Sequence, residues 1–564
     1  MPFVPYEIVQ EENVEAQMRD GTILRANIAR PRARGKFPAL VQRTPYGKGW
    51  ACAGLAAYGY VVINQDLRGR YASEGEFIPL FTDQHHDAED GYDTIEWAAS
   101  LPYCDGNVGT FGGSYCSWTQ WQLAPRQPPH LRAMAAGVLA ARLTDMERGG
   151  IFRTGRALEW VCGSLAPDTR RRTGGPKPHT PEEFWRLWDT ALRGKFYWFL
   201  PLAELPEWAL GTLGEYYRQW LADHTTDHFH FCERHKDVAV PNLHYTGWYD
   251  RHIGTVDHFN GVRQNALSDL ARRSQRLIIG PWTHGLLGGQ RVGEMDFGPQ
   301  AALNYEAVVL RWFDYWLKGI ENGVLEGPPV RIFVMGANHW RDEEEWPPAR
   351  AEEVVFYLHS RGRANTPYGD GSLSPDPPKD EEPDRFTYDP RDPVPTLYGQ
   401  RTQDEPRDQR VLDHREDVLV YQTPPLPEEV EVTGYPVLKL YAASSAPDTD
   451  FTAKLVDVHP NGFAQNLCYG ILRARYRQGF ARPELLTPGE VVEYTLELQP
   501  TSNRFLKGHR IRLDISSSDF PNFDRNHNTG GADYFEATLR VAEQTVLHDR
   551  VHPSRLILPV IREA

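Results

Sequence analysis

The sequence predicts an α/β fold that is interrupted by a helical insertion and followed by a β-sandwich. Three observations lead to this prediction. Strand-like and helix-like runs alternate up to about residue 145, as they do where helical crossovers join parallel strands. A helical stretch rich in aromatic residues fills 146–240. From residue 346 onward, a Pro- and acid-rich passage leads into many short runs of alternating apolar and polar residues, which is typical of a sandwich.

The first part of the chain shows the alternation most clearly. The run YGYVVINQD at 58–66 is short, β-branched and aromatic, as a buried strand is. Acidic residues open the run at 87–100, and its apolar residues fall on one face, as in an amphipathic helix. NVGTF then predicts another strand, and the residues after Ser114 predict another helix. We therefore expect a parallel sheet in this region.

Strand-like runs begin again at residue 241, with NLHYTGWYD and RLIIGPWTH. A chain of 564 residues is too long for a single core, and a prior of about 150 residues per domain suggests three or four units. We expect an α/β domain in two parts, 1–145 and 241–345. The insertion occupies 146–240, and the β-sandwich domain occupies 346–564.

Charge and composition narrow the range of partners. The chain carries 61 Lys and Arg against 76 Asp and Glu, a net charge of −15. An acidic protein repels phosphate backbones, so we expect no nucleic acid partner. The N-terminus lacks a basic segment followed by an apolar one, and no apolar run approaches the roughly 20 residues that span a bilayer. We expect neither a signal peptide nor a membrane partner.

The stretch VGTFGGSYCSW places two glycines directly before a serine, between a predicted strand and a predicted helix. A nucleophile elbow has this arrangement, because its serine occupies a strained turn whose neighbours must be small. The usual pattern is G-x-S-x-G. Gly112 and Ser114 match it, whereas Cys116 replaces the last glycine with another small residue. A glycine-rich turn without catalytic function would give the same pattern.

Two further residues at predicted strand ends complete a candidate triad. A nucleophilic serine needs a base, and the base needs an acid that orients it. In doubly wound hydrolases the chain order is Ser, then Asp or Glu, then His. NLHYTGWYD ends in Asp250, and RLIIGPWTH ends in His284. The order therefore predicts Ser114 as nucleophile, Asp250 as the orienting acid and His284 as the base.

Several motifs resemble one known family along nearly the whole chain. GTFGGSYCSWTQW, TGWYD and GPWTH resemble the cocaine-esterase-like (CocE/NonD) hydrolases and the related X-prolyl dipeptidyl-peptidases. RTPYGKG, QDLRGRYASEGEF and SSSDFPNFDRNHNTGG resemble further motifs of this family. The resemblance implies an α/β-hydrolase fold with an inserted helical cap and a C-terminal jelly-roll β-sandwich. It also implies catalysis without a cofactor or metal.

The resemblance further implies an oxyanion hole made of the backbone N–H of Tyr115 and the hydroxyl of Tyr46. A phenol is neutral near pH 7, since its pKa is about 10, so it can donate a hydrogen bond to a developing oxyanion. Pro45 has no N–H to give and favours an extended residue before it, which suits the presentation of the Tyr46 side chain. One such donor is typically worth about 10²–10³ in rate.

Candidate pocket residues lie near these positions in the chain. Trp160 belongs to the helical stretch, and His252 follows the predicted acid by two residues. Arg153 and Arg156, in the same run as Trp160, could contact an acidic acyl group. We expect both arginines to be solvated, as most arginines on helices are.

Other polar motifs are expected to be structural. Asp66 and Arg68 of QDLRGR are expected to pair with each other within a loop. The six cysteines are scattered without C-x-x-C spacing, which favours a reducing, cytoplasmic setting without disulfides or a zinc ribbon. No ligand spacing organises the four neighbouring histidines, so we expect a polar loop and no metal site; they are His224, His228, His230 and His235.

These observations predict a serine hydrolase that cleaves an ester, with an amide as an open alternative, of a small molecule through a covalent acyl-enzyme. An X-prolyl dipeptidyl peptidase or a β-lactam acylase (α-amino acid ester hydrolase) would add a site for a substrate amine or carboxylate, which the sequence does not identify. A carbohydrate-binding protein is the non-enzymatic alternative, but it would have no use for a triad. The oligomeric state stays open, with a homodimer as the commonest oligomer.

Overall fold

The computed structural model describes residues 5–251, 253–401 and 404–562. Within them, ten strands form one sheet in the order β1-β2-β4-β3-β5-β6-β7-β8-β11-β12. From β4 to β11 in this order the strands pair in parallel, whereas β1, β2 and β12 pair antiparallel at the edges. The strands are β1 (Ile8–Gln17), β2 (Ile23–Pro31), β3 (Phe37–Thr44), β4 (Val61–Asp66), β5 (Cys104–Gly113), β6 (Leu131–Gly137), β7 (Asn242–Tyr249), β8 (Arg276–Thr283), β11 (Val330–Val334) and β12 (His339–Glu343). The predicted parallel α/β sheet is confirmed.

Helices cover both faces of this sheet. Along β3, Ala39 and Val41 enter the core beneath α1 and α2, whereas Leu40 enters the core beneath α13, as the alternating directions of side chains on a strand require. The helix predicted at 87–100 coincides with α1. The helices are α1 (Asp87–Ser100), α2 (Tyr115–Leu123), α11 (Thr255–Asn265), α12 (Asp269–Arg273) and α13 (Tyr305–Lys318).

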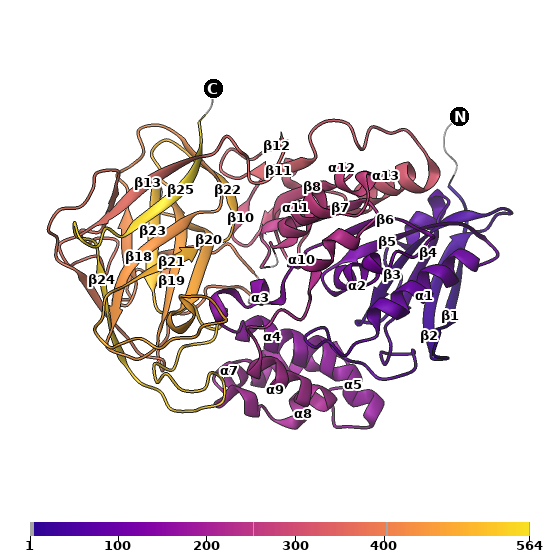
Figure 1. The fold of residues 1–564 in the computed structure, drawn as a ribbon, viewed down its shortest axis with the longest axis horizontal. Coiled ribbons are helices and arrows are strands. Elements are labelled where there is room, and N and C mark those ends of the chain that lie inside the picture. Colours follow the sequence, from indigo (N-terminus) through magenta and orange to yellow (C-terminus); the bar gives the residue numbers. More distant parts are fainter. Residues whose placement is uncertain (1–4, 252, 402–403, 563–564) are drawn as a thin grey trace.

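A chain of short helices connects β6 to β7. Its aromatic residues, among them Trp188 and Trp220, pack into the same hydrophobic core as α1 and α2. The short helices are α3 (Leu143–Met146), α4 (Thr154–Trp160), α5 (Ala166–Thr173), α6 (Pro181–Leu187), α7 (Arg193–Tyr197), α8 (Glu207–Leu210), α9 (Gly214–Ala222) and α10 (Phe231–Arg234). In Figure 1, α4, α5, α7, α8 and α9 lie together beside the loops of the C-terminal region, whereas α10 lies beside the sheet. Among the helices that the structure describes, none is long and apolar enough to cross a bilayer.

The C-terminal region is rich in β-structure, as predicted. Thirteen strands of the described residues pair in it, almost all antiparallel, and β25 lies among β13, β17 and β18. A small hairpin, β9 (Arg291–Val292) and β10 (Met295–Asp296), precedes it. The strands are β13 (Glu352–His359), β14 (Ser372–Ser374), β15 (Asp384–Tyr388), β16 (Leu419–Gln422), β17 (Val430–Gly434), β18 (Val437–Ser444), β19 (Asp450–Val458), β20 (Ala464–Arg473), β21 (Val492–Glu497), β22 (Thr501–Phe505), β23 (Arg510–Ser516), β24 (Ala542–Leu547) and β25 (Arg555–Ile561).

The C-terminal region packs directly against the sheet and the helical insertion. Gln465 on β20 donates a 2.9 Å hydrogen bond to the Tyr249 hydroxyl at the end of β7. The backbone N–H of Gly155 on α4 donates to the carbonyl of Pro521 at 2.6 Å. One hydrophobic core contains residues of β7, β8 and the C-terminal strands. The C-terminal region therefore helps to hold β7 and β8 in place.

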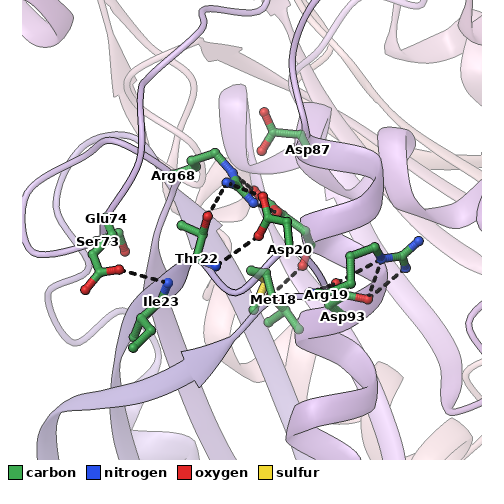
Figure 2. A network of polar contacts seen from close by, with 12 residues as sticks. Met18, Arg19, Asp20, Thr22, Ile23, Arg68, Ser73, Glu74, Asp87 and Asp93 are labelled. Atoms are coloured by element: carbon green, nitrogen blue, oxygen red, sulfur yellow. Dashed lines mark hydrogen bonds and ion pairs between the residues drawn. The ribbon is translucent and has the colours of Figure 1, made fainter.

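The predicted pairing of Asp66 with Arg68 is wrong. Asp66 ends β4, in register with Thr44 at the end of β3. This register brings the loop after β3 alongside, and the Lys48 ammonium lies 2.7 Å from the buried Asp66 carboxylate. Arg68 instead pairs with Asp90 of α1 at 2.6 Å and with Asp20 in the turn between β1 and β2 at 2.8 Å. Figure 2 shows Arg68 reaching this turn.

Candidate active site

Ser114 occupies a strained turn between β5 and α2. Its φ is 59° and its ψ is −127°, a backbone conformation that non-glycine residues rarely adopt. A Cβ at Gly113 would lie 2.4 Å from Val138, and one at Gly112 would lie 2.7 Å from the Cβ of Cys116. Cys116 can replace the usual glycine because Gly112 has no side chain to occupy the same space. The two glycines before the serine are thus explained by close packing at the turn.

Three side chains meet at the carboxyl ends of β5, β7 and β8. The His284 Nε2 lies 3.0 Å from the Ser114 hydroxyl oxygen, and the His284 Nδ1 lies 3.0 Å from an Asp250 carboxylate oxygen. Asp250 is fully buried, and its other oxygen accepts a 3.0 Å hydrogen bond from the Thr246 hydroxyl. The three residues predicted from strand order therefore meet, with His284 within hydrogen-bond distance of both Ser114 and Asp250.

Tyr46 faces the same site from the loop after β3. Its hydroxyl oxygen accepts a 2.9 Å hydrogen bond from the indole N–H of Trp160 on α4. Tyr46 and Ser114 line the same cavity. Although Tyr46 is 37% exposed, the surroundings of its hydroxyl disfavour the charged form and raise the pKa of Tyr46 to about 12. Since Trp160 supplies a donor, the Tyr46 O–H remains available to donate elsewhere.

The backbone around Tyr46 is held by polar contacts that the sequence analysis missed. The Tyr46 N–H donates to the Thr44 hydroxyl at 3.1 Å, so this N–H is already used. The buried Arg70 guanidinium donates to the Pro45 carbonyl at 2.7 Å. The Asp66 carboxylate binds the Lys48 backbone N–H and ammonium, each at 2.7 Å. These contacts therefore hold the backbone of the loop in place, while its Tyr46 side chain faces the site.

Tyr115 follows the serine and starts α2. Its ring is buried and packs edge to face against Tyr46, with the ring centroids 6.3 Å apart. The Ser114 carbonyl accepts hydrogen bonds from the N–H groups of Ser117 and Trp118 as the helix begins. The Tyr115 N–H lies ahead of these bonded groups, at the helix start, where backbone donors lack partners within the helix.

A cavity of about 460 Å³ opens over these groups, a size that suits a small molecule. Trp160, which the sequence analysis placed in the pocket, lines it, whereas the predicted pocket residue His252 lies outside the described residues. The lining also contains residues that the sequence analysis did not single out; these are Glu159, Ser164, Trp185 and Arg401.

The expectation that Arg153 and Arg156 are solvated is wrong. Arg153 is buried, lies 4.7 Å from the ring centroid of Phe523 and donates to the Tyr469 hydroxyl at 3.1 Å. Arg156 is buried in the wall of the cavity. The reason is that the C-terminal region covers the start of α4, which no periodicity within α4 reveals.

The four neighbouring histidines do not share a single partner, although two of them, His228 and His230, both contact Asp83. The two ring nitrogens of His224 lie 3.0 and 3.1 Å from the carbonyls of Leu221 and Gly150. His235 contacts His258 at 3.0 Å, while His228 and His230 lie 3.3 and 3.5 Å from Asp83. They do not converge on a common point.

A different group of side chains could hold a metal ion. In the C-terminal region, potential ligand atoms of Asp457, His459 and His509 lie within 4.8 Å of one another. The His509 Nδ1 lies 2.7 Å from the Asp457 carboxylate, whose other oxygen accepts a hydrogen bond from Asn503 at 3.1 Å. These bonds also account for the cluster without an ion. Asp457 and His459 lie two residues apart at the end of β19, whereas His509 directly precedes β23, so the sequence spacing marks only two of the three members.

The parallel sheet and the elbow serine beside His284 define a serine hydrolase. Residues 20–286 match the family X-Pro dipeptidyl-peptidase (S15 family), and residues 322–557 match the X-Pro dipeptidyl-peptidase C-terminal non-catalytic domain. Cocaine esterase of Rhodococcus sp. (strain MB1 Bresler) is 39% identical, and the alignment covers 98% of each chain. The chain belongs to the cocaine-esterase-like (CocE/NonD) family of serine hydrolases, as the motif resemblance predicts.

Solved structures share the whole architecture. An aminopeptidase from a marine sediment Thaumarchaeota archaeon is 26% identical with a TM-score of 0.82, and the match covers 99% of this chain and 97% of that one. An α-amino acid ester hydrolase is 23% identical with a TM-score of 0.79, covering 99% of this chain and 98% of that one. The hydrolase sheet, the helices and the β-rich C-terminal region therefore form a fold found in other proteins.

Proposed function

We propose that the chain hydrolyses carboxylic esters of small molecules through a covalent acyl-enzyme, with Ser114 as nucleophile, His284 as base and Asp250 as its orienting acid. The single observation that carries the proposal is the pair of 3.0 Å contacts that join these three residues through the two His284 nitrogens. Because Nδ1–H of His284 donates to Asp250, Nε2 carries a lone pair that can accept the serine proton.

The reaction follows from this proton path. As the Ser114 oxygen attacks the ester carbonyl, its proton passes to Nε2 of His284. The carbonyl oxygen becomes an oxyanion, for which we assign the Tyr46 hydroxyl and the Tyr115 N–H as donors. Collapse of the tetrahedral intermediate breaks the ester C–O bond, and the proton on Nε2 goes to the departing alcohol. A water molecule then repeats the sequence and releases the acid.

The domain organisation belongs to the same proposal. We assign 1–145 and 241–345 to the α/β-hydrolase domain, 146–240 to a helical cap and 346–564 to a jelly-roll domain. The cap assignment is supported by Trp160 and Arg156 of α4, which line the cavity above Ser114. The jelly-roll assignment is supported by the antiparallel pairing in the β-rich region.

The charges of the cavity wall favour an ester over an α-amino substrate. An aminopeptidase or α-amino acid ester hydrolase has to bind a substrate ammonium group. Of the described residues that line the cavity, Glu159 is the one whose carboxylate would have to bind the ammonium group. This carboxylate already accepts a 2.8 Å hydrogen bond from the Tyr197 hydroxyl. Arg156 lines the same cavity and would repel an ammonium group.

A labelling experiment tests the proposal. A fluorophosphonate should react with Ser114, and peptide mass spectrometry should locate the adduct there. Ser114→Ala should lose on the order of 10⁴–10⁶ in kcat towards acyl esters while keeping its melting temperature. A parallel panel of esters, aminoacyl anilides and β-lactam amides separates the esterase from its alternatives. An adduct on a different serine, or full activity of the alanine variant, would refute the assignment.

A further inference from the structure

The cavity above Ser114 is lined by a buried cation that has no hydrogen-bond acceptor among the described residues. Arg156 on α4 is 6% exposed and lines the cavity. Among the described residues, no side chain or backbone oxygen accepts a hydrogen bond from its guanidinium, and its Nη1 is buried without an acceptor. The guanidinium carbon lies 5.6 Å from the centroid of the Trp160 ring. Burying a charged group without hydrogen bonds is costly, so this arrangement requires an explanation.

Among the described residues, the acidic groups around Arg156 accept no hydrogen bond from its guanidinium. Glu147 attracts Arg156 through space, but burial raises the pKa of Glu147 to about 7, which weakens this attraction near neutral pH. Glu159 in the cavity wall is engaged by the Tyr197 hydroxyl. Burial lowers the pKa of Arg156 to about 10, which leaves it cationic at neutral pH.

The second arginine of the cavity differs in this respect. The Arg401 guanidinium lies 2.6 Å from the Asp189 carboxylate and 4.2 Å from the ring centroid of Trp185. Its charge is therefore balanced within the protein. Among the described residues, Arg156 therefore keeps N–H groups that can donate to a substrate that enters the cavity.

We propose that Arg156 binds a carboxylate group of the ester substrate, so that the enzyme prefers esters carrying a second, anionic carboxyl group over neutral esters. This inference rests on the proposed ester hydrolysis at Ser114, since Arg156 and Ser114 line the same cavity. A guanidinium binds a carboxylate through charge-assisted, often bidentate hydrogen bonds, which are stronger in a partly dehydrated site. The substrate carboxylate would supply the hydrogen-bond acceptors that Arg156 lacks among the described residues.

Matched esters test this preference. Methyl hydrogen glutarate carries the carboxylate in the acyl part and is compared with neutral methyl pentanoate. Acetoxyacetate carries it in the alcohol part and is compared with neutral ethyl acetate. We expect kcat/KM for one of the two anionic esters to exceed that of its neutral partner by about tenfold or more, and the pair that shows the preference locates the carboxylate.

Variants assign the preference to Arg156. Arg156→Met should reduce the ratio of anionic to neutral kcat/KM by about tenfold or more, and Arg156→Lys should retain part of it, because an ammonium keeps the charge but not the planar fork. Arg218→Met is the matched control: it removes the same charge from α9, where the side chain is exposed and does not line the cavity. Its ratio should equal that of the wild type.

A binding measurement keeps the test independent of turnover. Ser114→Ala should bind methyl hydrogen glutarate or acetoxyacetate in calorimetry, and adding Arg156→Lys should weaken that binding. The inference is overturned if neither anionic ester is preferred, or if the ratio is the same in wild type and Arg156→Met. Ser114-dependent hydrolysis of neutral esters in that case would leave the proposed function standing. Absence of any Ser114-dependent ester hydrolysis would refute the proposed function itself.

Discussion

The indole N–H of Trp160 donates a 2.9 Å hydrogen bond to the hydroxyl oxygen of Tyr46. This bond joins the helical insertion to the loop after β3, and in it the Tyr46 hydroxyl oxygen is the acceptor. An oxygen that accepts from Trp160 keeps its own proton for another partner. Trp160 is thus a positioning residue for the donor that we assign to the oxyanion.

Removing the Tyr46 hydroxyl should affect the chemical step. We expect Tyr46→Phe to lower kcat by about 10²–10³, with little change in KM or melting temperature, because the ring that lines the cavity is kept. Steady-state kinetics on an acyl ester and a thermal melt measure both effects. Near-normal kcat would mean that Tyr46 only packs.

Removing the Trp160 N–H should have a smaller effect of the same kind. Trp160→Phe should lower kcat about fivefold, the value of one neutral hydrogen bond, and should have no further effect in a Tyr46→Phe background. A double-mutant cycle measures this coupling. Trp208→Phe, at an exposed tryptophan of the insertion, is the control and should leave kcat unchanged. Additive losses would show that Trp160 acts independently of Tyr46.

The alkaline limb of the pH profile reports on Tyr46. Burial raises the pKa of Tyr46 to about 12, so the neutral, donating form persists well above the ordinary phenol pKa of about 10. We expect kcat to stay level between about pH 8 and about pH 10.5 in enzyme shown to remain folded. Ultraviolet titration of tyrosinate, compared between wild type and Tyr46→Phe, locates the ionisation. A fall in kcat centred near pH 10 that is absent in Tyr46→Phe would contradict the raised pKa.

The ion pair between Lys48 and Asp66 should affect activity because it holds the loop that carries Tyr46. Asp66→Asn leaves the Lys48 ammonium, 10% exposed in its side chain, without its counter-charge, which should cost about 3 kcal/mol of stability. We also expect a loss of kcat, because Lys48 lies two residues from Tyr46. Denaturant unfolding and kinetics on the same sample separate the two effects. Asp20→Asn, at the exposed partner of Arg68, should change neither substantially; equal effects of both variants would refute a specific role for Asp66.

A second buried ion pair links the site to the C-terminal region. Arg251, next to Asp250, lies 3.1 Å from Glu405, and both side chains are nearly inaccessible. Arg251→Met should lower the free energy of unfolding by about 3 kcal/mol or more, because it leaves a buried carboxylate unpaired. The double variant Arg251→Met with Glu405→Gln should recover part of this loss. Unfolding in urea measures both, and a double variant that is less stable than the sum of the two single losses would contradict the explanation.

The sequence contained enough to predict the sheet and the meeting of Ser114, Asp250 and His284. Each of these residues directly follows a strand of the parallel sheet, and parallel strands bring their carboxyl ends to one edge. Their catalytic roles remain predictions. The sequence could not show that Asp66 pairs with Lys48, because this depends on the register between β3 and β4.

The contents of the cavity were harder to predict for a related reason. Arg156 lies on α4, whose start is covered by the C-terminal region, and Arg401 reaches the cavity from a passage rich in proline and acidic residues. Both positions result from contacts between segments far apart in the chain. Local periodicity and composition describe a residue's neighbours in sequence, and they carry no information about such contacts.

The position of β25 has a consequence for how the protein is made. This strand lies among β13, β17 and β18, all of which are synthesised well before it. Until β25 emerges from the ribosome, these strands expose unpaired backbone edges, which are prone to associate with other chains. Substitutions on β25 should therefore appear first as low yield and inclusion bodies at high expression temperature, even where the purified enzyme works normally.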